Sequence, residues 1–215
     1  MLARMTWAKA LAVVAAATIT AMVPSCTRVV QDARAVAGGD LTTAAADGAA
    51  CIPVDPPLAI VPTEPGEPVL KLPQPAGWER ITEMDSDLVR YTLRNASLAA
   101  SAVVTFESVA GTGDPDEALD GVREGMMDVL GPDADVDIMR HEHCGLTAET
   151  IDYVNPGFGQ SGPLPATALS VVMVDDGRTH IASVNVLTKT PDDPTYARDA
   201  EAIVTGFQML PPSPN

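Results

Sequence analysis

The sequence ATALSVVMVDDGRTHIASVNVL, residues 166–187, contains two apolar runs on either side of Asp175-Asp176-Gly177. Both runs are rich in β-branched and aliphatic residues, which is typical of β-strands. Asp-Gly between two such runs is a strong β-hairpin signal, because Gly readily adopts the positive φ that the turn requires. The stretch therefore predicts an antiparallel hairpin with strands at 166–174 and 179–187.

The same kind of pattern continues on the N-terminal side of this hairpin. Apolar or alternating runs predict further strands at 69–72, 88–93, 101–109, 135–143 and 146–154. The segment Pro75-Ala76-Gly77-Trp78 predicts a turn after the first of these strands. We expect the Trp78 side chain to anchor the core.

Two helices interrupt the strands. Asp114-Pro115 predicts the start of the first, because Asp is a favoured N-cap and Pro is favoured at the first helical position, and Gly131-Pro132 predicts its end. Asp193-Pro194 predicts the start of the second, and Pro211-Pro212 ends the fold. Both helices carry an apolar stripe at helical spacing. The sequence therefore predicts an α+β fold, in which two amphipathic helices cover a largely antiparallel β-sheet.

The N-terminus has the features of a bacterial lipoprotein signal. Arg4 and Lys9 supply positive charge, Ala10–Val23 is apolar, and the small residue Ser25 precedes Cys26. The apolar run is short for a transmembrane helix. In bacterial lipoproteins a cysteine at this place is acylated and becomes the first residue of the mature chain. We therefore expect acyl chains such as palmitate on Cys26, at the outer face of the cell membrane; secretion without a lipid is the alternative.

Composition divides the chain into a signal peptide (1–25), an acidic tether rich in Ala, Gly and Pro (26–67) and one α/β sandwich domain (68–212). The end of the tether, from Cys51 onward, is expected to pack partly along the domain. The formal net charge is −16, and loss of the signal peptide removes two positive charges and no acidic residue. So acidic a surface repels nucleic acid and anionic headgroups. We expect no nucleic-acid partner, and contact with the membrane through the acyl chains.

Several motifs occur in an order that resembles the LpqN/LpqT family of mycobacterial and related actinobacterial lipoproteins. They are Val69-Leu70-Lys71-Leu72-Pro73, Gly77-Trp78, the strand Ala102–Glu107, Asp114-Pro115 and Ile203-Val204-Thr205-Gly206-Phe207. The resemblance covers about Pro68 to Leu210 and the lipoprotein signal. It implies a Mog1/PsbP-like α/β/α sandwich on the cell envelope, with a binding or scaffold role. The long acidic tether, Cys51 and Cys144 depart from the family pattern.

Cys51 and Cys144 remain as an even pair if Cys26 is acylated. Oxidising conditions outside the cytoplasm favour a disulfide between them. Such a bond would join the end of the tether to the strand near His143. Two free thiols are the alternative.

The segment His141-Glu142-His143-Cys144 raises the question of a metal site. On a strand, His141 and His143 share a face and Cys144 points to the other, whereas a structural zinc site needs about four ligands. We therefore expect an exposed edge beside a disulfide, with no metal or other cofactor. Gly159-Gln160-Ser161-Gly162 lacks the spacing of a nucleophile elbow, so we assign no catalytic residue and expect the chain not to be an enzyme.

Residues 155–163 surround Phe158 with Gly and Pro residues, which indicates a loop with an aromatic side chain near its tip. Exposed aromatic side chains often anchor interfaces, so Phe158 is a candidate partner contact; packing back onto the core is the alternative. These features predict a non-catalytic envelope lipoprotein that binds or scaffolds a protein partner. The alternative function is a carrier of a lipid or other apolar ligand.

Overall fold

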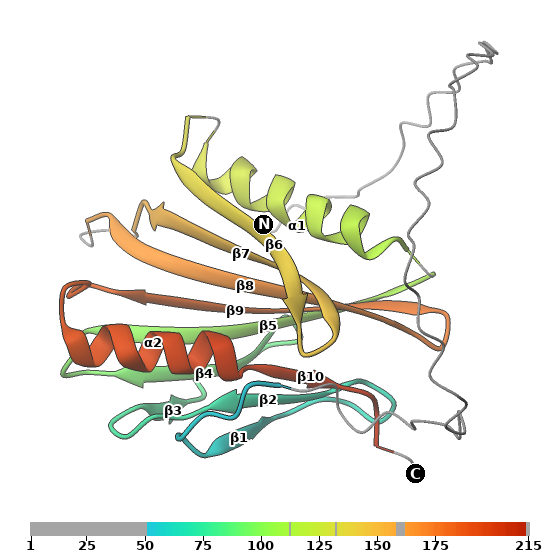
Figure 1. Cartoon of the computed structure of the whole chain (residues 1–215), viewed down its shortest axis with the longest axis horizontal. Helices are drawn as coiled ribbons and strands as arrows, with labels where there is room; N and C mark the ends of the chain where they lie inside the picture. The colour runs from blue at the N-terminus through green and yellow to red at the C-terminus, as the bar shows by residue number, and fades with distance from the viewer. Residues whose placement is uncertain (1–50, 112, 132, 158–161, 214–215) are drawn as a thin grey trace, which may run out of the picture. The chain divides into compact units, whose positions relative to one another are not determined.

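The structure, a computed structural model, describes residues 51–111, 113–131, 133–157 and 162–213 (Figure 1). The predicted signal peptide, the predicted acylation site Cys26, most of the predicted tether and Phe158 lie outside these residues. No helix within the described ranges is both long enough and apolar enough to cross a membrane.

Seven strands form the main β-sheet, in the order β3-β4-β5-β9-β8-β7-β6, and every neighbouring pair is antiparallel (Figure 1). The strands are β3 (Glu79–Ile81), β4 (Val89–Asn95), β5 (Ala100–Ala110), β6 (Val136–His143), β7 (Leu146–Asn155), β8 (Leu164–Asp175) and β9 (Arg178–Thr188). Each strand predicted between residues 88 and 187 belongs to this sheet. The antiparallel sheet of the prediction is therefore confirmed.

The β8–β9 hairpin has the predicted turn. Asp176 and Gly177 have positive φ values of 45° and 71°, and the flanking residues Asp175 and Arg178 lie opposite each other. The β6–β7 hairpin is built in the same way, with φ values of 53° and 78° at Cys144 and Gly145. This second turn places Cys144 at the tip of a hairpin.

Helix α1 (Pro115–Leu130) lies on one face of the main sheet, which we call the α1 face. It begins where the sequence predicted, because the Asp114 side chain accepts a hydrogen bond from the Asp116 amide. The helix contacts β7, β8 and β9. The apolar cluster between the helix and the sheet includes Met126 and Leu130 of the helix and Ile151, Tyr153, Ala166 and Ala168 of the strands.

Helix α2 (Pro194–Gly206) and a second, three-stranded sheet cover the opposite face, which we call the α2 face (Figure 1). This sheet has the order β1-β2-β10, with β1 (Leu58–Val61), β2 (Val69–Pro73) and β10 (Gln208–Leu210). The main core lies here, and its fully buried side chains include Leu70, Leu93, Val184, Ile203 and Phe207. The prediction that two helices cover the sheet is right only in part, because the small sheet covers much of the α2 face.

Strand β1 lies within residues 26–67, which the sequence analysis placed in the tether. It pairs with β2, and the opposite residues Val61 and Leu70 are both fully buried. Upstream, Val54 packs against Gly206, where an added Cβ would lie 2.6 Å from Val54 Cγ2. The chain from Val54 onward is therefore part of the folded domain. A four-residue strand with one buried side chain gives too short an alternation to be recognised in the sequence.

Candidate functional site

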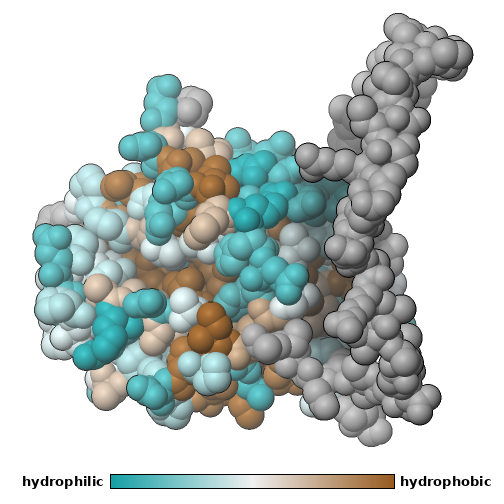
Figure 2. All heavy atoms as spheres, viewed as in Figure 1, coloured by the Kyte–Doolittle hydropathy of each residue, from teal (hydrophilic) through white to brown (hydrophobic). Residues whose placement is uncertain are grey.

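Helix α2 covers only part of the α2 face, and a groove remains between this helix and strands β6, β7 and β8. We call it the α2 groove. Its volume is about 460 Å³. Figure 2 shows apolar side chains at the surface between α2 and the outer strands. At this groove, side chains of the main sheet remain accessible on the α2 face.

Strand register brings the side chains of the groove to one face of the sheet. Thr150 lies opposite Met139 and Thr167 opposite Asp152, and opposite residues of antiparallel strands point to the same face. Alternate residues of β6 continue the same surface. The strand residues of the groove include Met139, His141, His143, Thr150, Asp152 and Thr167, and the helix contributes Tyr196, Ala200 and Val204.

His141 and His143 share the α2 face, as the alternation of β6 predicted. Their ring centroids are 6.3 Å apart, with the rings edge to face. Nε2 of His143 lies 2.7 Å from the carbonyl oxygen of Phe207, and Nδ1 of His141 lies 3.2 Å from that of Met139. Burial lowers the pKa of His143, and its hydrogen bond to Phe207 opposes this only in part. His143 is therefore a neutral residue that joins β6 to the end of α2.

The charged groups of the groove are acidic. Asp152 and Glu201 are among its lining residues, and none of the described lining residues is Lys or Arg. Asp152 accepts a hydrogen bond from the Thr167 hydroxyl. Burial, assisted by the charge of Asp152, raises the pKa of Tyr196 to about 12. The groove therefore combines apolar side chains, two carboxylates and a phenol that stays protonated at neutral pH.

A disulfide closes one end of this region. Cys51 is bonded to Cys144, and their Cα atoms are 4.4 Å apart. Cys144 directly follows His143, so the bond lies beside one end of the α2 groove. Cys144 is thus joined to Cys51 and does not share a metal site with His141 and His143. Among the described residues, no group of three or more His, Cys, Asp or Glu side chains is placed to hold a metal ion.

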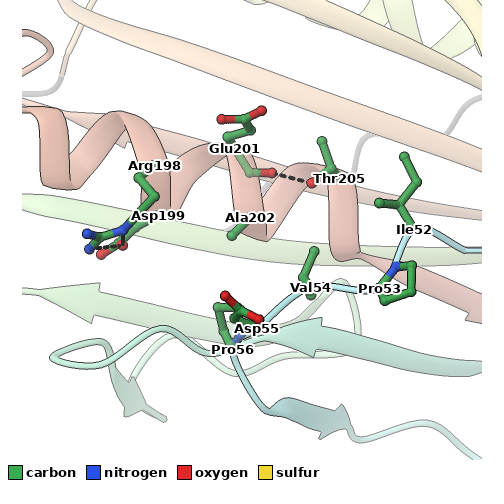
Figure 3. A pocket seen from close by; sticks show the side chains of 10 residues that line it. All are labelled: Ile52, Pro53, Val54, Asp55, Pro56, Arg198, Asp199, Glu201, Ala202 and Thr205. Carbon is green, nitrogen blue, oxygen red and sulfur yellow. Dashed lines mark hydrogen bonds and ion pairs between the residues drawn. The ribbon is translucent and has the colours of Figure 1, made fainter.

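A second groove, with a volume of about 370 Å³, lies between residues 52–56 and α2 (Figure 3). Beside it, the buried carboxylate of Asp199 accepts hydrogen bonds from Trp78 Nε1 at 3.0 Å and from Arg198 Nη2 at 2.9 Å. Trp78 is buried in the core, as predicted. These contacts attach α2 to the segment before β3, so we assign this second groove a structural role.

The α1 face holds a cluster of ion pairs. Oε2 of Glu149, a buried residue of β7, accepts hydrogen bonds from Arg123 of α1 at 2.9 Å and from Arg140 of β6 at 2.7 Å. Arg140 also pairs with Asp116 and Asp120. Burial lowers the pKa of Arg140, but its hydrogen bonds to these carboxylates outweigh the effect of burial, so that the pKa of Arg140 is raised. This cluster was not predicted from the sequence, where its one signal is the charged residue Glu149 at an inward position of an alternating strand.

Comparison with known proteins bears on the fold. No protein-family model matches the chain, and no curated protein matches it in sequence. The structure is similar to that of LpqN, described as involved in cell envelope biogenesis of Mycobacterium tuberculosis, with 17% identity, a TM-score of 0.56, and coverage of 72% of this chain and 92% of that chain. PsbP from the cyanobacterium Synechocystis shows 13% identity and a TM-score of 0.44 over 66% of this chain and 86% of its own. The resemblance to the LpqN/LpqT family is thus confirmed at the level of the fold, and the chain has an LpqN-like fold.

Proposed function

We propose that this chain is a non-catalytic binding module of the bacterial cell envelope, and that it binds a protein partner in the α2 groove. The observation that carries the proposal is the exposure of apolar surface at this groove, where the Met139 side chain is 60% exposed. Exposed apolar surface rimmed by polar groups is typical of interaction sites. LpqN, which shares the fold, is described as a protein of cell envelope biogenesis, and this supports an envelope location.

The polar groups of the groove favour binding over covalent catalysis. Nucleophilic catalysis needs a nucleophile in contact with a base. Ser, Cys and Lys do not occur among the described residues that line the groove, and neither of its histidines is hydrogen-bonded to a Thr, Tyr, Asp or Glu side chain there. One ring nitrogen of each histidine already contacts a backbone carbonyl, that of Met139 or that of Phe207. The carboxylates, the phenol and the histidines are thus suited to orient a partner.

Site-specific photocrosslinking in intact cells tests the proposal. A photoreactive amino acid at position 139 should give a reproducible protein adduct, because this position lies in the groove. The matched control is position 129 on α1, where Val129 is 73% exposed but lies away from the groove. A protein adduct at position 139 and none at 129 is the expected result. Equal adducts at both positions, or none at 139, would contradict it.

An apolar ligand is the second candidate, and the volume of the groove favours it, because about 460 Å³ falls in the range of small-molecule sites. Native mass spectrometry of the full chain, extracted from its own membrane in mild detergent, separates the two functions. Noncovalent mass that is lost on denaturation would indicate the carrier. Covalent acyl mass alone would favour the protein-binding module.

The acyl anchor is part of the same proposal. Denatured full-length protein from the native membrane should carry acyl mass on Cys26, because the residues before it fit a lipoprotein signal. The Cys26→Ser variant should lose that mass and leave the membrane fraction. Wild-type protein without acyl mass would contradict the anchor and leave the groove proposal to be judged by crosslinking.

A further inference from the structure

We propose that the partner contributes an extended, basic segment that adds as a new strand to the free edge of β6 and places alternate side chains in the α2 groove. This inference rests on the proposed function and specifies the kind of partner. It is based on two observations, which are the geometry of the sheet edge and the sign of the charge around it.

The edge strand β6 is suited to pair with another strand. Among the described residues it pairs only with β7, and it forms the end of the seven-stranded sheet. Its register with β7 is continuous from Val136 to His143. Sheet edges are commonly protected by a bulge, a proline, a very short strand or charged side chains, and of these β6 has only the charged side chains. β6 has eight residues, no proline and no register shift, so its outer backbone groups form a regular template.

The side chains of β6 provide apolar contacts on both faces of this edge. Met139 points to the α2 face and is 60% exposed, and Ile138 points to the α1 face and is 40% exposed. A strand added to β6 would place its own side chains beside these two, because directly opposite residues share a face. In strand addition the backbone supplies affinity and the pockets for alternate side chains supply specificity. The α2 groove lies where such a pocket is needed.

The charge around this edge favours a basic segment. Asp152 and Glu201 line the groove, and Asp137 and Glu142 are exposed residues of β6 itself. The cation of β6, Arg140, is already paired with Glu149, Asp116 and Asp120 on the α1 face. A Lys or Arg side chain in the groove would therefore meet carboxylates that have no basic neighbour among its described lining residues. Complementary charge also accelerates association.

The charge also argues against a second copy of this chain at the same edge. The formal net charge is −16, so two copies repel each other over their whole surfaces. Pairing of two β6 edges would bring the carboxylates of both copies together. A basic segment of a different protein has neither disadvantage.

A random octapeptide library, selected on the full chain in detergent, tests this inference. Enriched peptides should carry Lys or Arg and alternate with apolar residues. Backbone N-methylation at alternate positions discriminates strand addition from insertion of side chains alone, since only every second amide of an added strand faces β6. One of the two methylated sets should bind at least tenfold more weakly, and the other should bind as the parent peptide does. Equal binding by both sets would overturn strand addition.

Variants test the charge and the place of binding. Asp152→Asn with Glu201→Gln should weaken binding of the enriched basic peptides about five- to tenfold at low salt, and Glu124→Gln, an exposed acid on α1, should not. Hydrogen exchange should slow at the β6 amides when peptide is bound. No enriched basic peptide, or unchanged exchange at β6, would overturn the inference. Protein crosslinks at position 139 would then still support the groove, so the two proposals fail separately.

Discussion

The two faces of the main sheet hold their covering elements by different means. On the α2 face, α2 and the small sheet bury a large apolar core that includes Leu70, Ile203 and Phe207. On the α1 face, a small apolar cluster is joined by ion pairs centred on the buried carboxylate of Glu149. The stabilisation from apolar burial is roughly proportional to the buried area and does not depend on direction. The stabilisation from an ion pair depends on its geometry and its surroundings.

This difference accounts for the position of the α2 groove. On the α1 face, Arg140 of β6 contacts both the helix and β7, so the helix and the edge strand are joined by charged side chains. On the α2 face, the helix packs over β9 and β2, and the outer strands are left beside it. On this face, His143 connects β6 to the end of α2 and the Cys51–Cys144 bond connects it to the N-terminal segment, both at one end of the strand. The same strand is therefore tied on one face and accessible on the other.

The largest effect is expected in the core of the α2 face. Phe207→Ala should lower the free energy of unfolding by about 3–5 kcal/mol, because Phe207 is fully buried and its removal leaves a cavity. Urea denaturation measures this change, with an unchanged slope as evidence that the same folded state is compared. Met139→Ala is the matched control, since an exposed side chain should change stability by no more than about 0.5 kcal/mol. Equal losses in the two variants would remove the distinction between core and groove.

The second effect concerns the disulfide that attaches the N-terminal segment to the α2 face. The bond joins residues 93 positions apart. The Cys51→Ser/Cys144→Ser variant should lose about 2–4 kcal/mol of stability, because the bond restricts the unfolded chain. Exchange of the amides near Val54 should accelerate more than that of α1. Uniform acceleration throughout the domain would show that the bond stabilises both faces alike.

The sequence predicted the long elements well because their signals are local. Helix α1 begins after Asp114 and ends before Gly131, as its capping residues indicated. The Asp176-Gly177 turn and the strands beside it were also recognisable, since turn chemistry and alternation act within a few residues. Strand β2 of the small sheet was predicted at 69–72, but its two neighbours were not recognisable, because β1 and β10 have only four and three residues and β10 pairs with a strand far along the chain.

The groove could be predicted only in part. Alternation along β6 placed His141 and His143 on one face, and the structure has them there. The sequence did not reveal that Tyr196 and Val204 would form the facing wall, because the place where α2 rests depends on long-range packing with β2 and β9. Asp199 was missed for the same reason, since its partner Trp78 is 121 residues away. Long-range pairs leave little trace in a single sequence.

A smaller effect is expected from the ion pairs of the α1 face. Glu149→Gln removes the charge between Arg123 and Arg140 and should cost about 1–3 kcal/mol, less than loss of a fully buried pair, because both arginines are partly exposed and retain Asp120. Urea denaturation measures the loss, and hydrogen exchange locates it. Amides of α1 should exchange faster, and those of α2 should not. Faster exchange on both faces would contradict their separate attachment.

The smallest effect is a dependence on pH that belongs to the α2 face. All three histidines lie on this face, and the ring of His180 stacks on Phe106. Burial lowers the pKa of His180, and the positive charge of Arg178 lowers it further. The negative charges of Asp175 and Glu67 oppose this shift in part. In the unfolded chain His180 takes up a proton near pH 6.5, its ordinary pKa, whereas in the folded chain it takes up a proton only at a lower pH. Stability should therefore be complete above pH 6.5 and fall as the pH decreases below it.

The size and the origin of this loss can be measured together. Each histidine with a lowered pKa can contribute at most about 1.4 kcal/mol per pH unit, and carboxyl groups add their own effect mainly nearer pH 4. Urea denaturation between pH 7 and pH 5 should therefore show a shallower loss in His180→Phe than in the wild type, because the variant keeps a ring against Phe106 but cannot titrate. The remaining slope is assigned to His143, whose pKa burial also lowers. If His180→Phe lost stability as steeply as the wild type, the acid sensitivity would have to come from groups outside the core of the α2 face.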